Sequence, residues 1–333
     1  MSGLVDGFGR KIDYVRLSLT DKCNFQCFYC RPIKSERFLR PDQNDLQVKD
    51  IQKLFLALGR LGIRKVKLTG GEPTLRRDIC KIIDVLSSNP YLTDLSLTTN
   101  GFFLNQLAPA LKSAGLQRLN ISLDSLKSEV FRFVTQTTAF EKVWQGILRA
   151  IEVGFDAIKL NVVLMKGIND HEITDFVDLA LHYPLIVRFI EFMPTRRTQW
   201  DYKDTFFSNQ QAIAKIQQKY KLVSELYPHP TGPSRYYKVD GGRGRIGFIS
   251  PLSHNFCDKC NRMRITAKGQ LRLCLFSHEG IDLLGAIRQV SDDGQLAGQL
   301  EGIIRKSLRQ KPLDHHLEKR DIIPIESFVS IGG

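Results

Sequence analysis

Short apolar stretches and longer amphipathic stretches alternate over the first 190 or so residues of the chain. Each short stretch is rich in apolar residues and is followed by Gly, Asp, Asn or Pro, as the end of a strand should be. The pattern predicts six strands, at residues 14–19, 65–69, 95–99, 118–123, 157–165 and 186–193.

The longer stretches between these strands repeat apolar residues with the period of a helix. In residues 50–62 the repeat includes Leu54 and Leu58, and Gly62 suits a helix C-cap. Residues 142–154 and 171–183 show the same period. Six βα units imply parallel strands with right-handed crossovers, but they are too few for a closed eightfold barrel. We therefore predict an α/β fold with an incomplete (β/α)6 TIM-type barrel, with a doubly wound sheet as the alternative.

The pattern changes near residue 195, which predicts a second region. A helix is predicted at 209–220, and Gly/Pro-rich turns with hairpin-like segments continue to residue 276. We expect residues 1–194 to form the partial barrel and residues 195–333 to form a smaller α+β region that closes its open side.

Composition and charge narrow the function classes. The 333 residues carry a formal net charge of +13, which suggests nucleic acid or a polyanionic small molecule as partner. The basic residues are scattered, and no helix-turn-helix, RRM-like aromatic pair or basic helix is present, so a pocket for a small anion is favoured. No apolar run is long enough for a membrane span, and the first residues lack the basic and apolar regions of a signal peptide, so we expect none. We expect a cytoplasmic protein that binds neither membrane nor nucleic acid.

Three of the seven cysteines, Cys23, Cys27 and Cys30, follow the first predicted strand with the spacing CxxxCxxC. In a βα barrel this loop lies on the C-terminal face, where active sites are built. In a reducing compartment, clustered thiols more often bind metal than form disulfides. A [4Fe-4S] cluster normally takes four cysteines, so three would leave one iron open to another ligand. The alternatives are a structural zinc with a distant fourth ligand, or three buried thiols.

A second set of three cysteines lies near the C-terminus. Cys257 and Cys260 form CxxC, and Cys274 follows after thirteen intervening residues. His254 and His278 flank this set, so a zinc site with one histidine is as reasonable as an iron–sulfur cluster. The seventh cysteine, Cys80, lies in an apolar helical segment and is interpreted as a core residue.

Several polar and glycine residues stand at predicted strand ends, where ordinary structural roles are also common. The Gly-Gly of residues 69–73 lets the backbone approach a ligand, but it is also a frequent strand exit. Thr98 and Ser122 suit turns or helix N-caps, and Met193 suits the core. Arg262 and Arg264 would share one face of a strand, where they would be solvated unless they bind an anion such as phosphate.

The cysteine motif and the remaining motifs together resemble the GTP 3′,8-cyclase family of molybdenum cofactor biosynthesis, within the radical S-adenosylmethionine (SAM) superfamily. The resemblance spans nearly all of the chain and rests on a combination of motifs rather than on one. The matching stretches are "YVRLSLTDKCNFQCFYC", "TGGEP", "TTNG", "NISLDS", "KLNVVLMKGIND", "VRFIEFMP", "FCDKCNRMRIT" and the C-terminal "GG".

The resemblance implies two [4Fe-4S] clusters, one on Cys23, Cys27 and Cys30 and one on Cys257, Cys260 and Cys274. It implies SAM contacts from Tyr29, Gly71, Ser122 and Met193. It implies GTP contacts from Arg16, Lys67, Thr98, Lys159, Arg262 and Arg264. The family more often has Arg at the position of Lys67, so that contact departs from the pattern. Gly332 and Gly333 would form a tail that enters the active site, although a chain end is ordinarily frayed.

The reaction that the resemblance implies is a lyase-class cyclisation of GTP to (8S)-3′,8-cyclo-7,8-dihydroguanosine 5′-triphosphate. SAM would be cleaved to methionine and a 5′-deoxyadenosyl radical, which takes hydrogen from C3′ so that C3′ can attack C8. An electron donor such as flavodoxin or ferredoxin, a downstream cyclic pyranopterin synthase and a homodimer are the further partners implied. The alternatives are a twin-cluster radical SAM enzyme acting on peptide or RNA, and an electron carrier or zinc-stabilised RNA-binding module.

Overall fold

The computed structural model describes residues 3–30, 45–193, 202–225, 232–277, 280–290 and 292–315. All six predicted strands are present. The strands are β1 (Leu4–Val5), β2 (Lys11–Ile12), β3 (Tyr14–Ser18), β4 (Lys65–Thr69), β5 (Asp94–Thr99), β6 (Arg118–Ser122), β7 (Ala157–Leu164), β8 (Ile186–Glu191), β9 (Leu222–Glu225), β10 (Arg235–Val239), β11 (Arg245–Ile249), β12 (Arg262–Ile265), β13 (Gln270–Arg272) and β14 (Ile281–Asp282).

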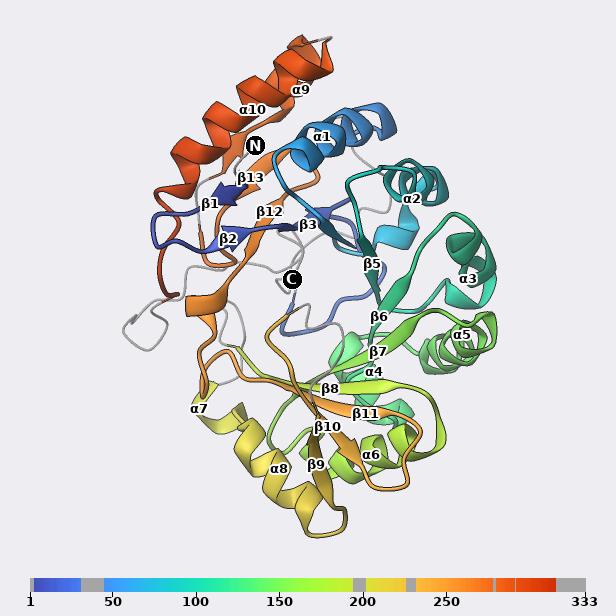
Figure 1. The fold of residues 1–333 in the computed structure, drawn as a ribbon. Coiled ribbons are helices and arrows are strands. Elements are labelled where there is room, and N and C mark those ends of the chain that lie inside the picture. The colour runs from blue at the N-terminus through green and yellow to red at the C-terminus, as the bar shows by residue number, and fades with distance from the viewer. Residues whose placement is uncertain are drawn as a thin grey trace.

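Helices follow most of the barrel strands, as the periodicity predicted. They are α1 (Val48–Arg60), α2 (Ile79–Ser87), α3 (Leu104–Ser113), α4 (Ser128–Thr135), α5 (Phe140–Val153), α6 (Ile173–His182), α7 (Tyr202–Thr205), α8 (Asn209–Gln217), α9 (Leu284–Gln289) and α10 (Asp293–Leu308). The apolar face predicted for α1 is buried: Ile51, Leu54, Phe55 and Leu58 are each fully buried. Helices α1, α2, α3 and α5 lie outside the curve of strands (Figure 1).

The central strands form one open sheet. The order β3-β4-β5-β6-β7-β8 is parallel throughout, and the whole twelve-stranded order runs from β14 at one end to β9 at the other. Among the described residues the two ends do not pair with each other, so the predicted incomplete barrel is confirmed and the doubly wound alternative is not.

The C-terminal third adds a parallel strand to each edge of the six. Strand β12 pairs with β3, with Arg264 opposite Arg16, and β11 pairs with β8, with Phe248 opposite Phe189. The connection at residues 250–261 therefore passes from one edge of the barrel to the other. Before this connection Ile249 lies opposite Ile190, near the end of β8, and after it Arg262 lies opposite Tyr14, at the start of β3.

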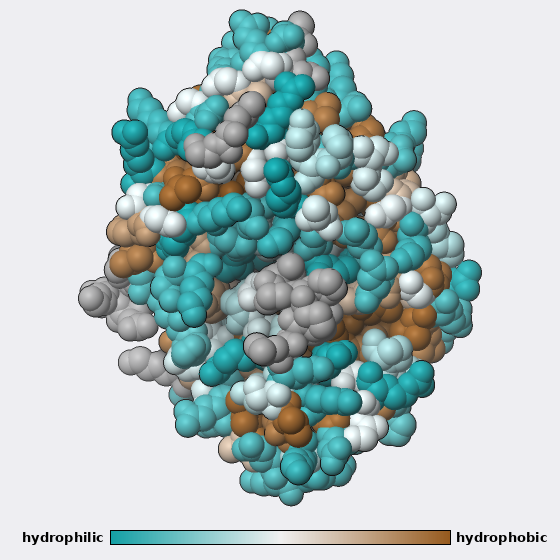
Figure 2. Space-filling view, in the orientation of Figure 1, coloured by the Kyte–Doolittle hydropathy of each residue, from teal (hydrophilic) through white to brown (hydrophobic). Residues whose placement is uncertain are grey.

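Two parts of the structure lay outside the prediction. Strands β1 and β2 form a separate antiparallel pair, and helices α9 and α10 pack against α1. The boundary proposed at residue 194/195 falls on residues outside the described ranges and stays a prediction. The face in Figure 2 is mainly hydrophilic, with hydrophobic residues in small separate patches. Among the described residues, no helix is long and apolar enough to cross a membrane.

Candidate active site

One cavity of about 360 Å³ lies at the C-terminal ends of the barrel strands, within the size range of small-molecule sites. Both cysteine sets contribute to its wall. Of the residues predicted to bind SAM or GTP, all except Lys159 line it: Arg16, Tyr29, Lys67, Gly71, Thr98, Ser122, Met193, Arg262 and Arg264. Gly332 and Gly333 lie outside the described residues.

The first cysteine loop is anchored by an aromatic side chain between its cysteines. Phe25 is 3% exposed and packs edge-to-face against Phe102 and Phe131 at centroid distances of 6.1 and 6.0 Å. Burial, followed by the neighbouring Cys30, raises the pKa of the Cys27 thiol well above its usual value. A buried thiol of this kind becomes a thiolate when a metal binds it, because the metal supplies the compensating positive charge. The loop therefore suits an iron–sulfur cluster.

The Gly-Gly turn after β4 packs directly on the segment that leads into Cys23. The Gly71 N–H donates to the Thr20 carbonyl at 2.7 Å, and a Cβ added at Gly71 would lie 2.0 Å from the Lys22 carbonyl oxygen. The Gly71 N–H is therefore used inside the protein rather than left for a ligand. The predicted SAM contact of Gly71 would have to involve another of its atoms.

Glu72, the next residue, joins the ends of β4 and β5, and sequence reasoning did not single it out. Its fully buried carboxylate accepts hydrogen bonds from the Thr99 hydroxyl and the Asn100 N–H, both at 2.7 Å, and from the Thr74 N–H at 3.0 Å. These donors make Glu72 a fixed support for the cavity floor around Gly71.

A second buried carboxylate connects the cysteine loop to the strands. Asp124 accepts a hydrogen bond from the Tyr29 hydroxyl at 2.7 Å and from the Val163 N–H at 2.9 Å. Burial raises the Asp124 pKa to about 6, against the opposing effect of these two donors. Tyr29 is thereby held between the first cysteine set and the strand end that carries Ser122.

The second cysteine set lies on the connection between β11 and β12 and on the loop after β13. The Cys257 N–H donates to Asn255 Oδ1 at 2.8 Å, and the Cys274 N–H donates to Ser277 Oγ at 3.2 Å. Burial raises the pKa of Cys257 to about 11. Burial also raises that of Cys260, but Arg262 and Lys311 together outweigh it and bring the Cys260 pKa down to about 7. The cationic neighbours thus favour the thiolate form of Cys260, which is the form that binds a metal.

Glu191 holds the loop before Cys257 against the end of β8. This fully buried carboxylate accepts hydrogen bonds from the Leu252 and Ser253 N–H groups at 3.2 and 3.0 Å, and from the Asn209 N–H at 3.1 Å. Glu191 lies two residues before Met193, so one side chain links the predicted SAM side to the second cysteine set. It was not predicted, because one acidic residue in an apolar strand has no diagnostic spacing.

Positive charge is concentrated on the cavity wall. Burial lowers the pKa of Arg16 to about 10 and lowers those of Lys67 and Arg264 well below their usual values. Arg188, which was not predicted, is 7% exposed and donates to Asn120 at 2.6 Å and to Asn161 at 2.9 Å. Because burying like charges costs free energy, this wall suits a polyanionic ligand that would offset the cost.

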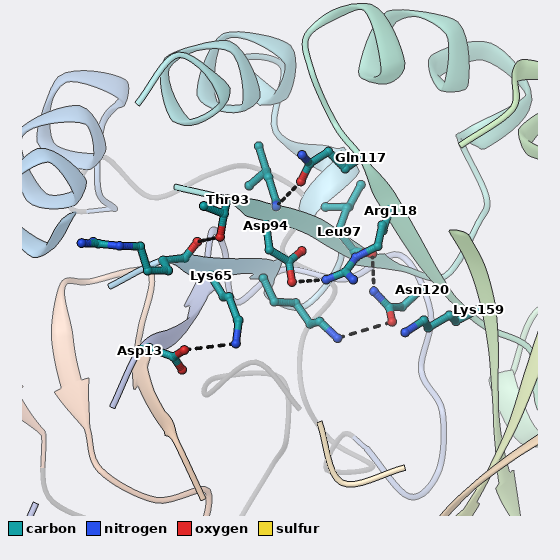
Figure 3. Close-up of polar contacts among 12 residues, drawn as sticks. Asp13, Lys65, Thr93, Asp94, Leu97, Gln117, Arg118, Asn120 and Lys159 are labelled. Atoms are coloured by element: carbon teal, nitrogen blue, oxygen red, sulfur yellow. Dashed lines mark hydrogen bonds and ion pairs between the residues drawn. The ribbon is translucent and has the colours of Figure 1, made fainter. Parts of the chain in front are cut away.

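Lys159 lies beside this wall rather than on it. Its side chain lies next to Asn120 (Figure 3), which accepts a hydrogen bond from Lys67 at 3.3 Å. Lys159 itself donates to the Tyr236 hydroxyl at 3.3 Å. Burial, with help from Arg188, lowers the Lys159 pKa to about 7. Further from the cavity, Lys65 pairs with Asp13 at 3.1 Å, and Arg118 pairs with Asp94 (Figure 3).

Of the two histidines expected beside the second cysteine set, only His254 lies in the described structure. His254 is exposed and is not part of the cavity wall, and His278 lies outside the described residues. A different histidine, His315, lines the cavity and is 5% exposed. Sequence reasoning missed it because it is more than forty residues from Cys274.

Comparisons with known proteins agree with this geometry. The family model "Radical SAM superfamily" matches residues 17–180, and "Molybdenum Cofactor Synthesis C" matches residues 185–317. A crystal structure of Streptococcus suis SuiB bound to S-adenosylmethionine superposes with a TM-score of 0.60 at 16% identity, covering 86% of this chain and 67% of that one. That likeness shows the fold. The matching family model and the CxxxCxxC loop together define a radical SAM enzyme.

The curated relatives are more specific. A protein of Desulforamulus reducens is 39% identical over 95% of this chain and 96% of its own length, and one of Peptoclostridium acidaminophilum is 40% identical over 100% and 99%. One of Pseudomonas fluorescens is 40% identical over 99% and 98%. Each carries the name GTP 3′,8-cyclase. The chain belongs to the GTP 3′,8-cyclase family, which confirms the resemblance.

Proposed function

We propose that the chain catalyses the radical SAM cyclisation of GTP to (8S)-3′,8-cyclo-7,8-dihydroguanosine 5′-triphosphate, the first step of molybdenum cofactor biosynthesis. The observation that carries the proposal is one cavity lined by both cysteine sets and by cationic side chains of strands β3, β4, β8 and β12. A cluster held by Cys23, Cys27 and Cys30 would supply the electron for the reductive cleavage of SAM.

The residues present fit two clusters, SAM and GTP. Cys23, Cys27 and Cys30 would hold one cluster, and Cys257, Cys260 and Cys274 the other, each leaving one metal position for a ligand. The SAM contacts proposed are Tyr29, Gly71, Ser122 and Met193.

The GTP contacts proposed are Arg16, Lys67, Thr98, Arg262 and Arg264, to which the geometry adds Arg188. Guanidinium groups bind phosphate oxygens through two hydrogen bonds at once, so they can both neutralise and orient a triphosphate. Lys159 would act from beside the wall through Asn120 and Lys67. The protein's contribution is to orient the two substrates and to keep water away from the reacting carbons.

The test is anaerobic incubation of the reconstituted enzyme with GTP, SAM and a reductant, followed by mass analysis of the nucleotide and of 5′-deoxyadenosine. The expected result is a cyclised nucleotide with the mass of GTP and equimolar 5′-deoxyadenosine. A protein that binds zinc and no iron, or that cleaves SAM without changing GTP, would contradict the proposal.

Several partners follow from this function. An electron donor such as flavodoxin or ferredoxin would reduce the first cluster, and a cyclic pyranopterin synthase would take the product. A homodimer and a cytoplasmic location are also proposed, the latter because free thiols and iron–sulfur chemistry suit a reducing compartment.

A further inference from the structure

Two side chains of types that ligate metals, Asp314 and His315, lie beside Cys257 of the second cysteine set. Cys257 Sγ, a carboxylate oxygen of Asp314 and a ring nitrogen of His315 all lie within 4.8 Å of one another. His315 is 5% exposed and lines the cavity together with Cys257, Cys260 and Cys274. Cys257 therefore has a carboxylate and an imidazole beside it, and the imidazole lies on the same cavity wall as the other two cysteines of the second set.

The segment that carries these donors is fixed to Cys257 by a buried arginine. Arg10 donates to the Cys257 carbonyl at 2.5 Å and to the Pro312 and Leu313 carbonyls at 2.7 and 3.0 Å. Arg10 is itself paired with Asp6 at 2.6 Å. The single guanidinium of Arg10 donates to all three carbonyls, so the backbone before His315 is held next to the backbone of Cys257.

A lysine fixes the same segment to the other two cysteines. Lys311 donates to the Arg262 carbonyl at 3.0 Å and to the Leu273 carbonyl at 2.5 Å. Arg262 lies two residues after Cys260, and Leu273 directly precedes Cys274. Residues 311–315 thus contact all three segments that carry the second cysteine set.

The ring of His315 is oriented as metal-binding histidines usually are. Its Nε2 lies 2.9 Å from the Pro251 carbonyl oxygen, which can only accept, so Nε2 carries the hydrogen. In the neutral ring Nδ1 then carries the lone pair, and it lies 3.5 Å from Asp314 Oδ1. Metal-binding histidines typically donate their other N–H to a carbonyl or carboxylate, which fixes the ring. The Phe276 ring, at a centroid distance of 5.5 Å, packs against His315.

We propose that His315 is an exchangeable fourth ligand of the second metal site: its Nδ1 binds the metal while no nucleotide is there, and the nucleotide displaces it. This proposal rests on the proposed function, because that function requires a metal centre on the second cysteine set with an open position that binds the substrate. Three thiolates and one imidazole form a complete ligand set for iron or zinc. The exchange is a ligand substitution with no redox step, because a neutral imidazole leaves as a neutral ring.

The test uses full-length protein with the first cysteine set replaced by alanine, so that only the second centre contributes. The protein is grown on ¹⁵N-histidine, reconstituted with iron and sulfide, and examined by pulsed EPR after reduction. The expected result is a ¹⁵N coupling without nucleotide, its loss on adding natural-abundance GTP, and its absence in His315→Gln. The glutamine amide can still donate to the Pro251 carbonyl, so this variant keeps the local contact. His254→Gln, on the same loop as Cys257 but exposed, is the matched control and should keep the coupling.

A second measurement follows metal retention. Loss of iron to a chelator without GTP should be about tenfold faster in His315→Gln than in the control, and the two should become equal with saturating GTP. No ¹⁵N coupling, or a coupling that survives His315→Gln, would overturn the proposal. A protein with no iron at this site would count against the proposed function instead. Zinc absorption spectra would then test His315 directly, with three sulfurs and one nitrogen expected and the nitrogen lost in His315→Gln.

Discussion

At the scale of single residues, the main feature of the cavity is a set of buried cationic side chains on its wall. Arg264 illustrates this, since burial, then Arg16 and Arg262, lower its pKa. Arg264→Ala is expected to weaken GTP binding by about tenfold to a hundredfold, the cost of one charge-assisted hydrogen bond, and to leave SAM binding unchanged. Isothermal titration of each ligand under anaerobic conditions measures both. The exposed Arg235→Ala is the control, and an equal loss for both ligands would indicate a folding defect.

Lys159 gives a pH dependence with a definite sign. Its pKa is lowered from 10.5 to about 7 by burial, so the unfolded chain holds this proton more tightly than the folded chain does. The free energy of unfolding should therefore rise as the pH goes from about 7 to 10.5, by about 1.4 kcal/mol for each unit of pKa difference. Lys159→Met should be more stable than the wild type near pH 7, and the difference should shrink toward pH 10.

Denaturation without nucleotide, for both proteins at several pH values, measures this difference. Lys67 titrates with the same sign, but it is present in both proteins and cancels in the comparison. Parallel stability curves for wild type and Lys159→Met would show that Lys159 keeps its usual pKa in the fold.

The residues found from sequence and those missed differ in a physical way. The cysteines and the arginines beside them can be recognised in the sequence, because several residues of one site lie close together in one short segment. Glu72, Asp124, Glu191 and His315 are single residues whose partners come from other elements. Glu191, for example, accepts from residues 18, 61 and 62 positions away. Such partners become visible only once the topology is known.

At the scale of elements, the turn after β4 shows how tightly the first cysteine loop is supported. A methyl group on Gly71 would meet the Lys22 backbone at 2.0 Å, and backbone cannot move aside as a flexible side chain can. Gly71→Ala is expected to displace residues 20–22 and with them Cys23. About half of the iron should be lost, and SAM binding with it, while the second site keeps its metal.

Iron analysis and SAM titration of Gly71→Ala test this expectation. Gly298→Ala is the matched control: it lies on an exposed face of α10, where an added Cβ meets nothing within 4 Å, and it should leave both readings unchanged. Full iron in Gly71→Ala would mean that the loop tolerates the shift.

The elements that were predicted correctly are those whose own sequence shows a clear periodicity. The pairing of strands that are distant in the sequence was not predicted. The six barrel strands and helices α1, α5 and α6 follow their periodicities closely. The parallel pairing of β12 with β3 and of β11 with β8 could not be predicted, because these strands look like members of hairpins, which they also are.

At the scale of the whole molecule, one cavity serves two metal sites that belong to different segments. Replacing Cys23, Cys27 and Cys30 by alanine should remove about half of the iron and abolish SAM cleavage. Replacing Cys257, Cys260 and Cys274 should remove the other half while some uncoupled SAM cleavage continues, since the first site is untouched. Iron content and 5′-deoxyadenosine formation measure these effects, and full iron in either variant would refute the assignment.

We expect the C-terminal Gly332 and Gly333, which lie outside the described residues, to act in product formation. Two residues without side chains can enter a narrow space beside a nucleotide and offer only backbone donors and acceptors. Their deletion should leave iron content and GTP binding largely intact while product formation collapses, because the effect is on positioning. A truncated protein with normal iron and the full rate of conversion would show that the tail is dispensable.

The pairing of both barrel edges with the C-terminal third has a consequence for biosynthesis. Arg10 and Cys257, which are 247 positions apart, must meet before the second site exists. While the chain is being made, β3 and β8 form the open edges of the sheet, with backbone groups that invite pairing with other chains. The nascent protein is thus most exposed to aggregation after its first cysteine loop can form and before β11 and β12 leave the ribosome. If iron and sulfide are delivered during that interval, the first cysteine set can bind them, whereas the second set has not yet formed.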